Sequence, residues 1–150
     1  MKKILYISVM LLGTILSGCD TIHGVNRKAE VYSLPDFKAV VSHIKKYPEI
    51  DEVEYRVDIG GKPLTFSGIK PPDKIYYISY KGRKNVSGTI HFKKDYNGNI
   101  TFNQYLLQMN SRPPQEQIDA TVPVMEKIEK DLEKNFGVVG IKKNIEIDYP

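Results

Sequence analysis

Side chains that could support acid–base or nucleophilic chemistry are few and widely spaced in this 150-residue chain. It has three histidines, His23, His43 and His91, and a single cysteine, Cys19. A catalytic base needs a nucleophile or an orienting carboxylate within hydrogen-bonding reach, and no local spacing brings such a set together. The sequence contains no G-x-S-x-G, H-E-x-x-H, P-loop or G-x-G-x-x-G motif. We expect no enzymatic activity, no metal site and no cofactor.

Two segments with oxygen-bearing side chains are the remaining candidates for chemistry. Glu52, Glu54 and Asp58 share one face of a predicted strand, and paired carboxylates can serve hydrolysis. Alternation places them on the solvent face, so we interpret them as a polar outer surface and rank a hydrolase last among the possible functions. Segment 95–99 has the oxygen-bearing side chains of a calcium loop without its spacing. Its Asn-Gly pair predicts a hairpin turn instead.

The N-terminus has the pattern of an export signal. Met1-Lys2-Lys3 precedes the apolar or weakly polar segment 4–16, which is too short to span a bilayer and is typical of a secretory signal peptide. Leu16-Ser17-Gly18-Cys19 then resembles the lipobox of bacterial lipoproteins. The resemblance implies that residues 1–18 are removed and that Cys19 carries diacylglycerol and commonly a further acyl chain such as palmitate. An ordinary signal peptide followed by a stray cysteine is the alternative.

The lipoprotein resemblance also implies a location. The chain is expected to be anchored to the cell membrane through lipid on Cys19, on the periplasmic or extracytoplasmic side. Asp20 resembles the signal that retains enteric lipoproteins in the inner membrane, so that membrane is expected where enteric sorting rules apply. With Cys19 lipidated, no cysteine is left for a disulfide, and the exported domain must be held together by its core.

Charge is nearly balanced outside the signal peptide. Removing Lys2 and Lys3 from 22 basic residues leaves 20 against 18 acidic ones, a net charge of +2. We therefore expect no nucleic-acid partner. Segment 70–94 is locally basic and rich in tyrosine, a residue that supplies rigid contact area at recognition surfaces. It predicts a binding surface made of Lys74, Tyr76, Tyr77, Tyr80, Arg83 and Lys84. A basic hairpin that protects a sheet edge is the alternative.

Hydrophobic periodicity predicts one α+β domain over residues 33–150, preceded by a lipidated tether over 19–32. Ser33 is expected to cap a first helix, with Pro35 in its first turn and Pro48 beyond its end. Alternation then predicts five strands at 52–59, 64–69, 74–80, 86–93 and 100–109.

A second amphipathic helix is expected to follow the strands. Pro123 predicts a kink or a division into two short helices, and Gly137 a C-cap. A last strand is expected over 141–149. The order α-β-β-β-β-β-α-β indicates an antiparallel meander sheet packed against two helices.

These features favour a lipid-anchored, non-enzymatic binding module. It would act on another envelope component, most simply a protein, as an inhibitor, an immunity protein or an assembly accessory. The alternative is a carrier or sensor of a small apolar ligand or lipid, held between the first helix and a curved sheet.

Overall fold

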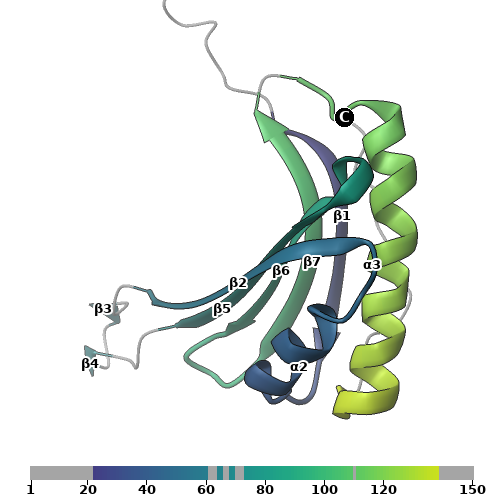
Figure 1. Ribbon diagram of the computed structural model, residues 1–150. Coiled ribbons are helices and arrows are strands. Elements are labelled where there is room, and N and C mark those ends of the chain that lie inside the picture. The colour runs from purple at the N-terminus through teal and green to yellow at the C-terminus, as the bar shows by residue number, and fades with distance from the viewer. Residues whose placement is uncertain (1–21, 61–63, 66–67, 70–72, 110, 139–150) are drawn as a thin grey trace, which may run out of the picture.

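Five antiparallel strands form a curved sheet that carries both helices on one side (Figure 1). The computed structural model describes residues 22–60, 64–65, 68–69, 73–109 and 111–138. The strand order in the sheet is β1 (Ile22–Val31), β7 (Ile100–Met109), β6 (Ser87–Lys94), β5 (Lys74–Gly82) and β2 (Ile50–Ile59). The helices are α2 (Phe37–Ile44) and α3 (Gln115–Phe136). The predicted single α+β domain with a meander and two helices is confirmed.

Strand β1 corrects the predicted tether. Residues 22–31 pair with β7 over the whole length of both strands, so they belong to the folded domain that was expected only from Ser33 onward. The inward side chains of β1 include Val25 and Val31, but Arg27 lies between them and is itself buried. An arginine at an inward position hides the alternation that would otherwise have indicated a strand.

Helix α2 begins one turn later than Ser33. Asp36 is its N-cap, and the carboxylate accepts hydrogen bonds from the backbone N–H groups of Lys38 and Ala39. The Ser33 hydroxyl instead donates to the carbonyl oxygen of Gly137, at the end of α3. Ser33 therefore joins the segment before α2 to the end of α3 and does not cap α2.

Helix α3 is continuous through Pro123, so the expected division into two helices is wrong. Proline removes the hydrogen bond to the carbonyl of residue i−4, here Asp119. Both residues are exposed, so water can hydrate the freed carbonyl. Gly137 ends the helix in the left-handed conformation, with φ of 64°, as predicted.

Short connections join strands β5, β6 and β7. A 3₁₀ turn, η1 (Arg83–Asn85), follows β5, and Asp95 closes the β6–β7 hairpin by accepting hydrogen bonds from the N–H groups of Asn97 and Asn99. The single strand predicted over 64–69 is instead two short paired strands, β3 (Leu64–Thr65) and β4 (Gly68–Ile69), outside the main sheet. The predicted last strand, 141–149, lies outside the described residues.

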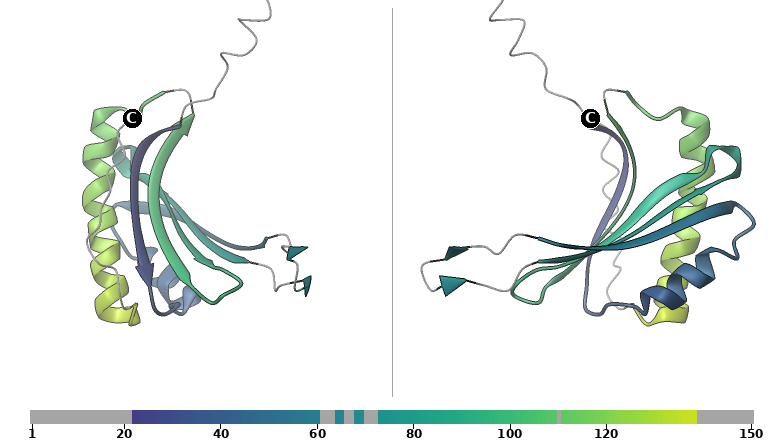
Figure 2. Two further views of the ribbon diagram at one scale, coloured as in Figure 1. Left: turned by 180° about the vertical axis from the view of Figure 1, so that it is seen from behind. Right: turned by 60° about the vertical axis from the view of Figure 1, so that its left-hand side comes forward.

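The core lies between the sheet and the two helices. It is filled by buried side chains of both layers, among them Phe37, Ile44, Ile78, Ile90, Phe92, Phe102, Ile128 and Leu132. Figure 2 shows α2 and α3 on the same side of the sheet, while the opposite side carries no helix. Strands β1 and β7 bow toward α3, so the side without helices is concave along these two strands.

A polar network fixes α3 to the sheet inside this core. Arg27 is 4% exposed and binds Glu129 with both ends of its guanidinium group, at 2.7 Å (Nε to Oε1) and 2.8 Å (Nη2 to Oε2). The Gln104 amide donates to Glu129 Oε1 at 3.2 Å and accepts from the buried Tyr80 hydroxyl at 3.1 Å. Because buried polar groups must be paired, this network selects one position of α3 on the sheet.

Candidate functional site

The predicted tyrosine surface is divided between the two faces of β5. Consecutive strand residues point to opposite sides. Tyr76 packs against the core, with its ring stacked on Phe37 at 4.5 Å between centroids. Tyr80 is 1% exposed and belongs to the core network. Assigning Tyr76 and Tyr80 to an outer surface was therefore wrong, and only Tyr77 of the three tyrosines faces away from the helices.

The basic members of the predicted surface are also separated. Lys74 begins β5, whereas Arg83 and Lys84 lie in η1 beyond its end. Nine residues of extended strand place the two groups about 30 Å apart. Arg83 lies 3.4 Å from Asp51 of the β2 start, measured from Nε to Oδ1, and all three basic side chains are exposed. The structure thus does not bring the six predicted residues together.

The face of the sheet opposite the helices offers a different site, which we call the open face. Its two central rows cross all five strands from β2 to β1, as the strand registers define. The first row is Arg56, Tyr77, His91, Asn103 and Lys28. The second row is Glu54, Ser79, Thr89, Tyr105 and Asn26.

Aromatic rings occupy the centre of the open face. Tyr77 and His91 lie 5.3 Å apart between ring centroids, and His91 and Tyr105 are 6.3 Å apart with their rings nearly perpendicular. The Arg56 guanidinium carbon lies 4.5 Å from the Tyr77 ring centroid, a cation–π arrangement. The result is a rigid aromatic platform with a cation at one end.

Three polar atoms of the open face are buried without a hydrogen bond to any described residue. They are Nε2 of His91 and Oδ1 of both Asn26 and Asn103. His91 and Asn103 are directly opposite on neighbouring strands, and Asn26 is opposite Tyr105. Such groups are normally paired in folded proteins. They have almost no contact with solvent, so another molecule would reach them only if their side chains turned.

The electrostatic state of this platform follows from its partial burial. Burial, and secondarily the charge of Lys93, lowers the pKa of His91 below its ordinary value. The imidazole is therefore neutral at pH 7. Burial, with a smaller contribution from Tyr77, raises the pKa of Tyr105. The centre of the open face thus presents uncharged hydrogen-bonding groups between rings.

The predicted acidic strand residues border the open face. Glu52, Glu54 and Asp58 lie on its β2 edge, on the solvent side as predicted. The Arg56 guanidinium Nε is 3.5 Å from Asp58 Oδ2. These carboxylates form an exposed acidic margin beside the aromatic platform.

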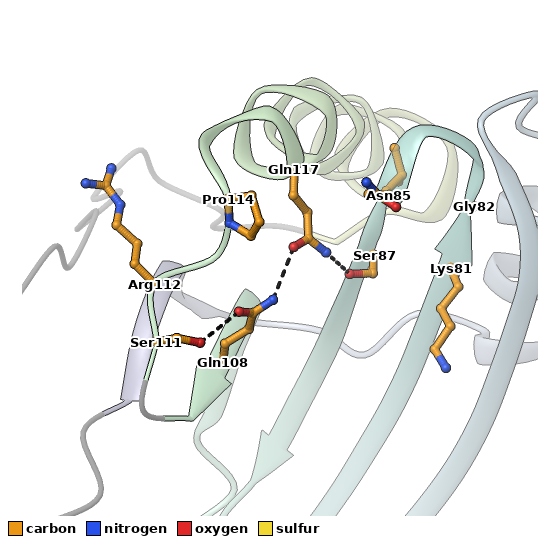
Figure 3. Close-up of a pocket in the computed structure, with 10 residues that line it drawn as sticks. Lys81, Gly82, Asn85, Ser87, Gln108, Ser111, Arg112, Pro114 and Gln117 are labelled. Atoms are coloured by element: carbon orange, nitrogen blue, oxygen red, sulfur yellow. Dashed lines mark hydrogen bonds between the residues drawn. The ribbon is translucent and has the colours of Figure 1, made fainter.

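An open pocket of about 590 Å³ lies between η1, the end of β7 and the start of α3 (Figure 3). A chain of hydrogen bonds crosses it, from Ser111 to Gln108 (3.2 Å), from Gln108 to Gln117 (3.3 Å) and from Gln117 to Ser87 (3.0 Å). Arg112 extends away from these residues. The polar side chains of this pocket are mainly bonded to one another, so it is a weaker candidate than the open face.

His43 takes part in a contact between the two helices, which we call the clasp. Asp131 of α3 accepts hydrogen bonds from His43 Nε2 (2.7 Å), from the Tyr47 hydroxyl and from Asn135. Partial burial raises the pKa of Asp131, but the bonds from Tyr47 and His43 outweigh it and hold the pKa below its ordinary range. This arrangement ties α2 to α3.

Comparisons with family models, curated proteins and solved structures give no match to this chain. Among the described residues, no group of three His, Cys, Asp or Glu side chains is placed to hold a metal ion. Neither helix in the described ranges is long and apolar enough to cross a membrane. Cys19 and Asp20 lie outside the described residues.

Sequence reasoning missed most of the open face. Asn26 was assigned to the tether, and Asn103 and Tyr105 were read only as parts of a strand. Alternation along each strand already places Tyr77, His91 and Tyr105 at outward positions. The missing information was the register between strands, which decides which outward residues are neighbours.

Proposed function

We propose that this protein is a non-enzymatic binding module that is held at a bacterial membrane by lipid on Cys19 and binds another envelope protein with its open face. The observation that carries the proposal is the group of unpaired polar atoms on Asn26, His91 and Asn103, beside Tyr77 and Tyr105. Tyrosine is enriched at protein interfaces because its rigid ring has one apolar body and one polar tip.

The mixture of rings and amides favours a protein partner. A partner that covers the open face would remove the Tyr77 and Tyr105 rings from water. If the Asn26, His91 and Asn103 side chains turned on binding, the partner would also bond to their unpaired polar atoms. Interfaces of this kind combine a buried aromatic centre with a charged margin. The acidic margin, Glu52, Glu54 and Asp58, would then form part of the rim.

The start of β1 supports a position close to the membrane. Ile22 is three residues from Cys19, and an extended chain spans at most about 3.6 Å per residue. The start of β1 therefore lies within about 11 Å of the proposed lipid anchor. Figure 1 places the β3–β4 hairpin far from the start of β1. In this arrangement the partner would be bound beside the membrane surface and not at the end of a long tether.

The alternative function, a carrier of a small apolar ligand, has less support. Its ligand was expected between the first helix and the sheet. That space is occupied by Phe37, which stacks on Tyr55 and Tyr76 and contacts Phe92 edge to face. We therefore do not propose it.

Crosslinked capture from the envelope of the producing cells tests the proposal. The full chain carries an affinity tag and is compared with a Tyr77→Ala/Tyr105→Ala variant and with Tyr32→Ala. Tyr32 is an exposed tyrosine outside the sheet and serves as the matched control. We expect one stoichiometric protein with the native chain and with Tyr32→Ala, and its loss with the double variant.

Equal capture by all three proteins would contradict the proposed surface, and no capture by the native chain would contradict the proposed function. Thermal unfolding of each variant shows whether a loss of binding reflects a loss of folding. A separate comparison tests the anchor. Cys19→Ser should remove the lipid mass and release the chain from the membrane fraction.

A further inference from the structure

Strand β2 is an edge strand with an uncovered apolar side. Among the described residues it pairs only with β5, so its other edge carries backbone groups without a partner strand. Tyr55, Val57 and Ile59 point to the helix side of the sheet but are 39%, 44% and 68% exposed. Exposure increases along the strand because β2 extends beyond α2 (Figure 1).

The usual protection of a sheet edge is weak on this strand. Natural edges are shielded by charged side chains, by proline, by inward-pointing charges or by bulges. Segment 52–59 has charged side chains only on the side away from the helices. From Glu52 to Ile59 the register with β5 is regular, and the only irregularity lies between Ile50 and Glu52. This segment contains no proline, and its helix-side positions are all apolar. Eight consecutive residues are therefore able to accept another strand.

The chemistry of the two sides of β2 specifies the incoming strand. The helix side presents the apolar row Val53, Tyr55, Val57 and Ile59. The other side presents Glu52, Glu54 and Asp58, with Arg56 as the single cation. Arg56 already contacts the Tyr77 ring and Asp58. A strand with apolar residues on one side and lysine or arginine on the other would match both sides.

We propose that the β2 edge binds an extended segment of a partner protein with alternating apolar and basic residues, by strand addition. Backbone hydrogen bonds to β2 provide the part of the affinity that is the same for every peptide sequence, and the two side-chain rows of β2 select the sequence of the partner segment. The charged row of this site is also the β2 margin of the open face, whereas its backbone edge and its apolar row are separate from that face.

A second copy of this chain fits the β2 edge less well. In an antiparallel pair centred on Tyr55, Glu54 faces Arg56 twice, but Glu52 faces Asp58 twice. Like charges directly opposite are destabilising. Pairing centred on Arg56 or on Glu54 places like charges opposite at the centre. Pairing centred on Val57 avoids this, because Arg56 faces Asp58 twice, but Glu54 then faces Gly60 and gains no basic partner. A basic strand can pair with Glu52, Glu54 and Asp58 together, so it offers more opposite-charge pairs than a second copy does.

Peptide binding to the full chain in neutral phosphatidylcholine nanodiscs tests this proposal. The probes are a labelled Lys-Val-Lys-Val-Lys-Val-Lys peptide, its Glu-Val counterpart and a Lys-Val peptide with a central proline. We expect the basic peptide to bind at least about tenfold more tightly than the acidic peptide. Proline should abolish binding because it cannot maintain a strand ladder. Empty nanodiscs provide the blank.

Charge exchange provides the matched variants. Glu52→Lys/Glu54→Lys should reverse the preference between basic and acidic peptides, whereas Glu133→Lys at an exposed position of α3 should leave it unchanged. Hydrogen exchange should slow at the amides of residues 52–59 and not along β1. Ile59→Lys, at an exposed position, should weaken binding about tenfold without loss of folding.

Three results would overturn the proposal. These are equal binding of the two charge types, unchanged exchange along β2, and concentration-dependent dimerisation that Arg56→Glu abolishes. The last result would assign the edge to a second copy. The peptide tests at β2 can fail while the Tyr77→Ala/Tyr105→Ala variant still loses capture. That combination would refute the β2 proposal and leave the proposed function intact.

Discussion

Removing Arg27 should destabilise the domain more than any exposed substitution, because it leaves a buried carboxylate without its main partner. Arg27 and Glu129 share two charge-assisted hydrogen bonds of 2.7 and 2.8 Å, and the Glu129 side chain is 12% exposed. Breaking a buried pair from one side costs about 3–5 kcal/mol. A domain of this size has about 5–15 kcal/mol of stability in total. Arg27→Met should therefore lose a large fraction of it.

Removing both charges should cost much less. A buried pair that is replaced by apolar residues of similar volume leaves no unpaired charge. In Arg27→Met/Glu129→Leu the Gln104 amide keeps the Met125 carbonyl and the Tyr80 hydroxyl as partners. We expect the double variant to recover most of the stability that the single variant loses.

The pH dependence gives a second signature. Burial raises the pKa of Glu129 against the lowering effect of Arg27, and the arginine is absent from the single variant. When the pKa of a carboxyl is higher in the folded than in the unfolded protein, the folded protein loses stability as the pH rises from the unfolded pKa to the folded pKa. The unfolded pKa of Glu129 is about 4.5. The cost of Arg27→Met should therefore be larger at pH 8 than at pH 5.

Urea unfolding followed by circular dichroism measures these differences on the chain without its signal peptide. Native protein, Arg27→Met and the double variant are compared at both pH values. A loss below about 1 kcal/mol in the single variant, or a double variant as unstable as the single one, would refute the assignment of the ion pair.

Three further predictions concern the clasp, the core and the open face. Asp131→Asn should lower the free energy of unfolding by about 1–2 kcal/mol at pH 7 and by less below about pH 4, because the native clasp itself weakens as Asp131 is protonated. Urea unfolding at several pH values measures this difference. Gly88→Ala should cost about 1–3 kcal/mol in the same assay, because its Cβ would lie 2.4 Å from the Tyr80 hydroxyl oxygen, and an unchanged unfolding midpoint would contradict this packing. His91 should titrate below its ordinary pKa in an NMR titration, and Lys93→Ala should shift that pKa partly back; a normal value would mean that the imidazole is fully hydrated.

The sequence predicts the parts of the fold that depend on local pattern. The apolar stripe of the first helix identifies its element because that face is buried against the sheet. Alternation over 52–59 identifies a strand although its apolar side is largely exposed toward Ile59. Strand β1 was not predicted because Arg27 occupies an inward position. A buried arginine is tolerated there because it pairs with Glu129, which is 102 residues away in the sequence. A single-sequence pattern carries no information about such a partner.

The candidate site was predictable only in part, for a related reason. Composition correctly singled out β5 as rich in tyrosine, but proximity in sequence was taken for proximity on a surface. Tyr76 and Tyr77 are neighbours in the chain and lie on opposite faces of the sheet. The true neighbours of Tyr77 on the open face are His91 and Arg56, which come from other strands.

Site-specific photocrosslinking in the producing cells tests the central claim most directly. A photoreactive amino acid replaces either Asn103, at the centre of the open face, or Lys130, an exposed residue of α3 on the other side of the molecule. If the open face is the binding surface, the residue at position 103 should crosslink to one defined envelope protein and the residue at position 130 should not. Crosslinking of that protein from position 130 alone, or with equal yield from both positions, would contradict the account.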